Sequence, residues 1–133
     1  MLYAVLAYHD ERDVQAWTDA EDAAQMARLD QVHTRLTHEG RLGPAARLGA
    51  TSTAVTVGGA PLVLDGPFAE TKEALLGFYL LDCASLDEAI ASVQDIKAVN
   101  PGAIYEIRPV VLYLPGAPLA RAEAGLELVR PRR

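Results

Sequence analysis

Residues 77–90 read GFYLLDCASLDEAI and place a buried strand directly before a helix. The run 77–82 is almost entirely apolar or aromatic, which is typical of a strand covered on both faces. Ser85 precedes Glu88 by three residues, the capping-box pattern that begins a helix. Apolar residues then recur every three or four positions until Asn100-Pro101-Gly102 ends the helix. These observations predict a strand followed by a helix as one unit.

The start of the chain has the same order of elements. Residues 2–8 are apolar and end at the polar cluster His9-Asp10-Glu11, which predicts a strand. Thr18 and Glu21 form a second capping box, and Gly40 is expected at the end of the helix that follows. The apolar stripe of this helix consists of Met26, Leu29, Val32, His33 and Leu36. We therefore expect two units of a strand followed by a helix.

The segment between these units supplies shorter strands. Residues 41–50 contain Pro44, so they predict at most a short edge strand. Residues 53–57 and 61–64 are apolar runs on either side of Gly58-Gly59, which is typical of a hairpin. The hairpin is expected as an insertion between the two units.

A last apolar strand is expected over residues 104–113 and completes two β-α-β halves. This order predicts an α+β fold, namely a ferredoxin-like split βαβ sandwich with both helices on one face of the sheet. The other face of the sheet is left open. Because large exposed apolar faces are usually covered, we expect a homodimer.

The composition limits the classes of function. At 133 residues the chain has room for one domain with a core of its own. Its formal net charge of −6 argues against a nucleic-acid module, which needs a basic face. Cys83 is the single cysteine, so neither a disulfide framework nor a cysteine-based zinc site is expected, and no metal or cofactor is predicted. No apolar run is long enough to cross a bilayer and no basic segment precedes the first strand, so we expect a cytoplasmic protein without membrane contact.

The charge is divided unevenly along the chain. Residues 1–114 hold 16 acidic and 8 basic side chains, a net charge of −8, whereas residues 115–133 hold four arginines and two glutamates, a net charge of +2. The second segment is also interrupted by Pro115 and Gly116. We therefore predict an acidic domain over residues 1–114 and a basic C-terminal arm over residues 115–133.

Residues 64–73 carry the most distinctive chemistry, reading Leu-Asp-Gly-Pro-Phe-Ala-Glu-Thr-Lys-Glu. Asp65 and Gly66 favour a tight turn, and Pro67 restricts the backbone on both sides of itself. A turn alone needs no ionic groups, yet Glu70 and Lys72 follow at once, beside the start of a buried strand. The stretch is therefore a candidate functional segment as well as a structural turn.

This stretch resembles the signature of the YCII-related family, in the branch named for its Asp-Gly-Pro-Phe motif. The similarity extends from residue 1 to about residue 112 and includes His9-Asp10-Glu11, Glu39-Gly40, residues 77–82, Ser85-Leu86-Asp87-Glu88-Ala89 and residues 104–110. The resemblance implies a dimeric α/β barrel built from ferredoxin-like subunits, in agreement with the order of elements. The C-terminal arm lies outside it.

The same resemblance implies two kinds of function. Other YCII-type relatives carry a His-Asp pair for acid/base chemistry in a cleft by the sheet, and superfamily members include lyases, isomerases and monooxygenases. In this chain the position that matches the helix histidine of the relatives is Leu29, which cannot transfer a proton. The branch is frequently encoded beside extracytoplasmic-function sigma factors, which implies a regulatory or accessory role as the alternative.

Two residues are candidates for catalysis. His9 stands at the end of the first strand, where a carboxylate of Asp10 or Glu11 could hold its ring and raise its pKa into the range for proton transfer. An exposed strand-end histidine is the equally acceptable structural interpretation. Asp65 could act as a general base at the rim of the cleft, or could accept hydrogen bonds from its own turn.

Four residues are candidates for substrate binding. Glu70 and Lys72 could bind a polar substrate, or could pair with each other or with Arg108. Arg108 shares a strand face with Glu106, and if Tyr105 packs under the helices both point to the open face, where Arg108 would suit a carboxylate or phenolate. An Arg-Glu pair would serve equally well as structural support.

The fourth is Tyr79, which could orient a ligand through its hydroxyl or could belong to the core. His33 lies on the apolar stripe of its helix, so we interpret it as a packed histidine, and Cys83 as an inert small residue.

Three hypotheses follow for the chain. In the first, the chain is a small-molecule enzyme of lyase or isomerase type. In the second, it binds a small-molecule ligand without catalysis; both place the cleft at the open sheet face. In the third, the alternative, it is a regulatory module that acts with a sigma factor. A fourth, purely structural interpretation assigns residues 65–73 to the architecture of the hairpin.

Overall fold

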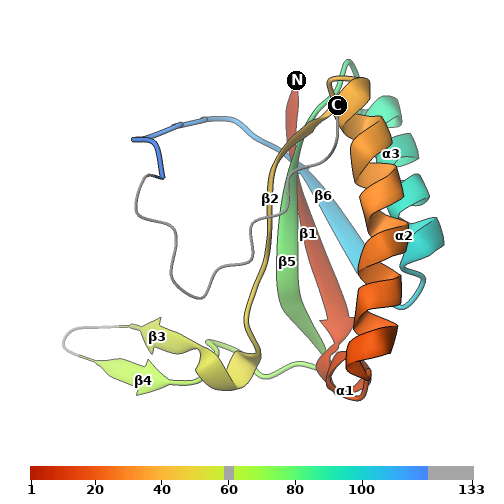
Figure 1. Ribbon diagram of the computed structural model, residues 1–133. Coiled ribbons are helices and arrows are strands. Elements are labelled where there is room, and N and C mark those ends of the chain that lie inside the picture. The colour runs from red at the N-terminus through yellow and green to blue at the C-terminus, as the bar shows by residue number, and fades with distance from the viewer. Residues whose placement is uncertain (59–61, 120–133) are drawn as a thin grey trace.

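The computed structural model describes residues 1–58 and 62–119 and consists of one four-stranded sheet with helices on one face (Figure 1). The elements in chain order are β1 (Leu2–Asp10), α1 (Glu11–Gln15), α2 (Asp19–His38), β2 (Leu42–Arg47), the 3-10 helix η1 (Thr51–Thr53), β3 (Val55–Val57), β4 (Val63–Asp65), β5 (Glu73–Asp82), α3 (Leu86–Val99) and β6 (Ile104–Pro109). The predicted α+β class is confirmed.

The strand order of the sheet is β2-β5-β1-β6, and every neighbouring pair is antiparallel. Two β-α-β halves that interlock in this way are consistent with the predicted ferredoxin-like fold. The edge strand β2 is irregular in register between Leu42 and Ala45, where Pro44 cannot donate a ladder hydrogen bond. Strands β3 and β4 pair only with each other and form the predicted hairpin.

Both long helices begin at the predicted caps. Thr18 Oγ1 accepts a hydrogen bond from the Glu21 backbone at 3.1 Å, and Glu21 Oε1 accepts one from the Thr18 backbone at 3.1 Å. At the start of α3, Ser85 Oγ accepts a hydrogen bond from the Glu88 backbone. These contacts satisfy backbone donors that have no partner within the helix. Gly40 follows the end of α2 with a φ of 73°, the left-handed conformation that glycine adopts without steric cost.

The core lies between the helices and the sheet face that they cover. Val5 and Leu81 from the sheet and Leu36 and Ile96 from the helices are completely buried. Burial of each such side chain contributes about 1.5–3 kcal/mol relative to leaving it in water. Tyr105 and Ile107 of β6 pack against the same core. The residues that alternate with these two along β6 therefore face away from the helices.

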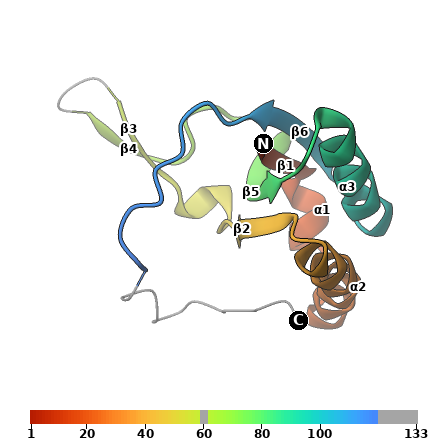
Figure 2. The ribbon, with the colours of Figure 1, turned by 90° about the horizontal axis from the view of Figure 1, so that it is seen from above.

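The opposite side of the sheet is not covered by a helix. The hairpin β3–β4 and the segment after β6 both extend from the sheet on this side, as the two views agree (Figures 1 and 2). Both segments expose large apolar side chains, which are Val55, Val57, Val63 and Leu64 on the hairpin and Val111, Leu112 and Leu114 after β6. The open side of the sheet is therefore flanked by two apolar arms.

The structure corrects several predicted boundaries. Strand β1 continues to Asp10 and β5 begins at Glu73, because Ala74 and Glu73 pair with His9 and Asp10. Strand β6 ends at Pro109 instead of residue 113, since β1 begins at Leu2 and offers no pairing partner beyond the bond from the Val110 backbone. The short helices α1 and η1 were not predicted.

Two predicted features lie partly outside the described residues. The hairpin turn includes residues 59–61, and the four arginines of the predicted C-terminal arm fall within residues 120–133. Among the residues that are described, no helix combines the length and the apolar character that a bilayer span requires.

Candidate functional site

A cleft of about 670 Å³ lies at the end of the sheet where β1 runs into α1. Its walls come from β1, the turn after α1, the N-terminal half of α2 and the loop that follows α3. We call it the His9 cleft and define it by His9, Trp17, Gln25, Arg28, Asn100 and Gly102. It combines a potential base, an aromatic wall, a cation and a buried amide.

His9 is held in one orientation by the backbone. Its side chain lies on the helix side of β1 and only 7% of the residue is exposed. Nδ1 lies 3.1 Å from the main-chain oxygen of Asp10. Because a carbonyl can only accept, Nδ1 carries the hydrogen, and in the neutral ring Nε2 is then the acceptor. Nε2 makes no hydrogen bond within residues 1–58 and 62–119 and is available to a ligand.

The predicted carboxylate partners of His9 serve other groups. Asp10 caps α1 and pairs with Arg12 at 3.1 Å, a contact that lowers the pKa of the Asp10 carboxyl. Glu11 turns to Thr51, whose hydroxyl and backbone N–H lower the pKa of Glu11 by donating hydrogen bonds to its carboxylate. The expectation that one of them holds the ring is therefore wrong, because the Asp10 main-chain carbonyl does so.

Gly102 lets the loop after α3 approach the His9 ring closely. A Cβ at residue 102 would lie 2.7 Å from His9 Nε2, closer than non-bonded atoms approach. The backbone of Gly102 does not adopt a positive φ, so the glycine is required by the neighbouring ring and not by the turn. Lys97 Nζ fixes this loop by donating to the carbonyls of Pro101 at 3.0 Å and Ala103 at 2.7 Å.

Trp17 forms the aromatic wall of the cleft. Its ring centroid lies 5.6 Å from that of His9, with an interplanar angle of 82°. This edge-to-face arrangement stabilises both rings and restrains their positions. Trp17 directly precedes the N-cap of α2, so its place depends on the same capping box that begins the helix.

Gln25 and Arg28 extend from α2 into the cleft as a connected pair. Gln25 is buried, and its Nε2 donates to the Val99 carbonyl at the end of α3. Arg28 Nη2 donates to Gln25 Oε1 at 2.5 Å. The buried amide therefore joins the two helices and orients the guanidinium at the same time.

A second cleft, of about 400 Å³, lies at the base of the hairpin. We call it the hairpin cleft; its lining includes Glu11, Thr51, Gly66, Pro67, Glu70 and Thr71. Gly66 has a φ of 104°, a conformation that favours glycine, and its backbone N–H bonds to the Ala54 carbonyl at 2.7 Å. Residues 66–71 therefore line a depression as well as forming a turn.

The structure distributes the predicted site residues over several surfaces. His9 lines the first cleft and Glu70 the second. Asp65 is exposed at the end of β4, next to Gly66, and Lys72 is exposed just before β5. Within one chain, these residues do not converge on a single cleft.

Tyr79 and Arg108 face opposite sides of the sheet. Tyr79 packs under the helices, where burial raises the pKa of its hydroxyl. Its oxygen lies 2.9 Å from His33 Nε2 (ring centroids 5.3 Å apart), and burial lowers the pKa of His33. Arg108 is exposed on the open side and lies 3.8 Å from Glu106, the Arg-Glu pair that the spacing suggested.

Sequence reasoning missed four residues of the His9 cleft, namely Trp17, Gln25, Arg28 and Gly102. Gln25 carried a usable signal, since it stands four residues before Leu29 on the buried stripe of α2, where a polar side chain needs a partner. No signal in the sequence indicated the role of Gly102, because a glycine after a helix is already explained as a helix terminator.

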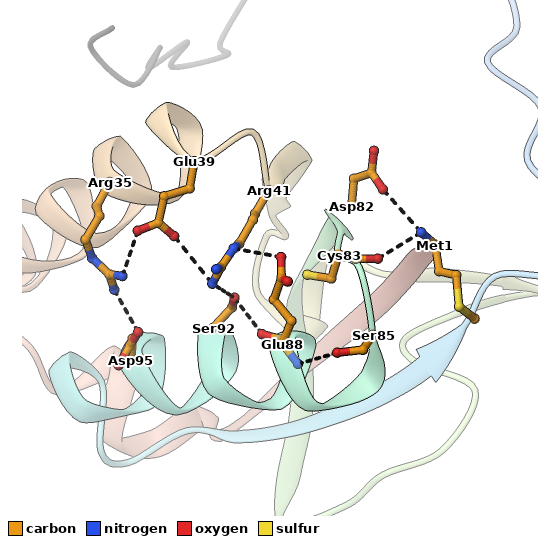
Figure 3. Close-up of polar contacts among 10 residues, drawn as sticks. All are labelled: Met1, Arg35, Glu39, Arg41, Asp82, Cys83, Ser85, Glu88, Ser92 and Asp95. Carbon is orange, nitrogen blue, oxygen red and sulfur yellow. Dashed lines mark hydrogen bonds and ion pairs between the residues drawn. The ribbon is translucent and has the colours of Figure 1, made fainter.

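An ionic network fastens the other end of the helix pair (Figure 3). Arg41 Nε lies 2.9 Å from Glu88 Oε1, and Arg41 Nη1 lies 3.2 Å from Ser92 Oγ. Arg35 Nη2 reaches Asp95 at 2.8 Å. Beside this network Cys83 is buried, and burial raises the pKa of its thiol, which supports an inert role. The network supports the fold and leaves the cleft free.

Comparison with known proteins identifies the relatives of the chain. Residues 1–113 match the YCII-related domain. A protein from Rhizobium meliloti (strain 1021), described as uncharacterised, is 52% identical over 120 residues, which cover 87% of this chain and 97% of the relative.

Proposed function

The chain belongs to the YCII-related family, and from this premise we propose that it binds a small molecule in the His9 cleft and moves a proton there. The observation that carries the proposal is the orientation of His9. Its Nδ1–H is committed to the Asp10 carbonyl, and its Nε2 is left as an acceptor on the cleft wall. A buried, oriented imidazole of this kind is suited to general acid/base catalysis.

The reaction class is that of a lyase or an isomerase. Nε2 removes a proton from carbon or oxygen of the ligand, and the imidazolium returns it to another atom of the ligand or to a leaving group. No electron acceptor is needed, because the electron pair of the broken bond stays in the ligand or leaves with the departing group. The cleft opens to solvent at exposed residues such as Arg28 and Gly102, so a proton held on Nε2 can also exchange with water.

The other predicted site residues receive different roles in this proposal. Glu70 belongs to the hairpin cleft, together with the turn residues Gly66 and Pro67. Asp65 is exposed at the end of β4, next to Gly66. Lys72 lies near Asp10, whose pKa it lowers through its charge. Tyr79 acts from within the core, through His33. Arg108 belongs to the open side of the sheet.

Proton transfer is tested by exchange of carbon-bound hydrogen in D2O. A panel of neutral ketones and small keto acids is incubated with the protein, and loss of the proton signal next to each carbonyl is followed by NMR. We expect exchange with wild type and with His38→Gln, since His38 is an exposed histidine outside the cleft. His9→Gln should lose it. Equal exchange by wild type and His9→Gln contradicts the proposal, and so does absence of exchange across the panel.

The open side of the sheet supports a homodimer, with the barrel formed by two sheets facing each other. The hairpin is a two-stranded sheet of three-residue strands, and such a hairpin is marginally stable in water on its own. Its exposed valines would be covered by a second copy, and Phe68, which is 92% exposed, stands beside them. A C2 dimer would cover the hairpins of both copies at once.

A regulatory role is the second candidate function, and one observation favours it. Val111, Leu112 and Leu114 are largely exposed on the segment after β6, away from the His9 cleft. The resemblance of residues 65–68 to the Asp-Gly-Pro-Phe branch, which is frequently encoded beside extracytoplasmic-function sigma factors, suggests this partner. Calorimetric titration with such a sigma factor tests this role. Binding that Leu112→Asp abolishes supports it, and absence of binding at micromolar protein contradicts it.

A further inference from the structure

Arg28 differs from every other arginine in the described part of the chain. Five of the six arginines there pair with a carboxylate, namely Arg12, Arg35, Arg41, Arg47 and Arg108. Arg28 instead donates to the neutral amide oxygen of Gln25. Asp13 lines the same cleft, yet no ion pair joins it to Arg28 within residues 1–58 and 62–119. Among the described residues, no carboxylate therefore pairs with this exposed guanidinium on the cleft wall.

This exception is notable because carboxylates are abundant. Residues 1–114 hold 16 acidic side chains and 8 basic ones, so acidic side chains outnumber basic ones two to one. A guanidinium offers five N–H donors in a planar fork that matches a carboxylate. One of the five is used by Gln25 Oε1. No hydrogen bond within residues 1–58 and 62–119 uses the other four, so they can meet an anionic oxygen that enters the cleft.

Gln25 makes this cation a built feature of the cleft. Its buried amide is anchored at 2.5 Å to the Val99 carbonyl and presents its oxygen to Arg28, also at 2.5 Å. An arginine on the outside of a helix normally samples many rotamers, and ordering it costs side-chain entropy. The anchored amide meets part of that cost before a ligand arrives.

We infer that the ligand of the His9 cleft is a small carboxylate with a planar body. Arg28 binds the carboxylate, Trp17 packs against the body, and His9 Nε2 faces the proton that is transferred. The inference rests on the proposed function and names its substrate class. In the reacting step the C–H bond breaks as the Nε2–H bond forms, and the electron pair moves onto the neighbouring carbonyl oxygen as an enolate.

The single tryptophan of the chain provides the readout, since Trp17 lies on the cleft wall. Its fluorescence is titrated with pairs of probes that share a shape and differ in charge: benzoate against benzamide, cinnamate against cinnamamide, and pyruvate against pyruvamide. We expect the carboxylate of at least one pair to bind about tenfold more tightly or better than its amide. Arg28→Gln should remove this preference. Arg47→Gln, which removes a charge paired with Asp22 outside the cleft, should keep it.

The outcomes separate the ligand class from the proton transfer. Equal binding of acid and amide, a preference that survives Arg28→Gln, or no binding by any pair overturns the carboxylate inference. If neutral ketones still exchange in a His9-dependent manner, the proposed function stands without it. Conversely, an Arg28-dependent preference together with exchange that His9→Gln leaves unchanged supports the carboxylate site and overturns the proton transfer.

Discussion

His9 and Gly102 meet so closely that a single methyl group at residue 102 would lie 2.7 Å from the imidazole Nε2. The two residues are far apart in the sequence, and the ring reaches Gly102 because β1 ends beneath the loop that follows α3. The nitrogen that we propose as the base is therefore open only while residue 102 has no side chain.

Gly102→Ala should impair the cleft and the fold together. The added methyl must displace the His9 ring or the loop held by Lys97, and overpacking of this kind costs about 1–3 kcal/mol. We expect a lower urea midpoint and at least about a tenfold loss of His9-dependent exchange. Gly58→Ala is the matched control, because a Cβ there meets nothing within 4 Å and should change neither quantity. Normal exchange by Gly102→Ala would remove the proposed base from the reaction.

The open side of the sheet predicts that a charge on the hairpin will separate two subunits. Val57 is 77% exposed in the single chain, and in the proposed dimer it is buried against the partner. Val57→Asp should shift the sedimentation coefficient from that of a dimer to that of a monomer, because an unpaired carboxylate is costly to bury. Leu86→Asp places the same charge on an exposed apolar residue of α3, on the helix side, and should leave the dimer intact. A monomeric wild type is the contrary result.

Burial of His33 predicts that the protein is less stable in acid. Burial lowers the pKa of His33 in the folded state below its ordinary value of 6.5, while the nearby Asp30 opposes this shift. The unfolded chain therefore binds the proton more readily, and stability contributed by the neutral ring is lost as the pH falls below about 6.5. His33→Gln, which can still bond to the Tyr79 hydroxyl, should flatten the dependence of the melting temperature on pH between pH 7 and pH 5.

His38→Gln is the control for this effect. His38 is an exposed histidine of the same helix, so its replacement should leave the pH dependence as it is in the wild type. An identical slope for wild type and His33→Gln would show that other groups cause the acid sensitivity.

The ionic network between α2 and α3 predicts unequal contributions from two arginines. Arg41 is partly buried and contacts both Glu88 and Ser92, so Arg41→Met should cost about 1–3 kcal/mol in urea unfolding. Arg47 is half-exposed and pairs only with Asp22 among the described residues, and Arg47→Met should cost less than about 1 kcal/mol. Equal losses would mean that the network of Figure 3 adds nothing beyond surface pairing.

The sequence predicted the fold well because its signals are local. Capping boxes at Thr18 and Ser85 and apolar runs of fixed period were visible without any knowledge of contacts, and the structure has a helix at each. The strand boundaries were less accurate. The pairing of His9 with Ala74 depends on how two distant segments align, and neither segment predicts this alignment by itself.

The candidate site was predicted only in part, for the same reason. His9 and Glu70 could be singled out by residue type and position, and each lines a cleft. Two contacts of the cleft arise only from the packing of α2, α3 and β1, namely Gln25 with Val99 and His9 with Gly102. The spacing of residues along the sequence does not predict this packing. Residues 65–72 are chemically dense, yet none of them lines the His9 cleft.

Strand β1 carries both Val5, at the centre of the core, and His9, at the cleft, and it is hydrogen-bonded to β5 on one side and β6 on the other. An inner strand of this kind opens only when the whole domain unfolds. Its amide hydrogens should exchange with solvent more slowly than those of the edge strand β2, and the site should not be lost by local fraying. Denaturant should therefore extinguish activity and structure in one cooperative transition, and sequence changes anywhere in the core will reach the imidazole through global stability.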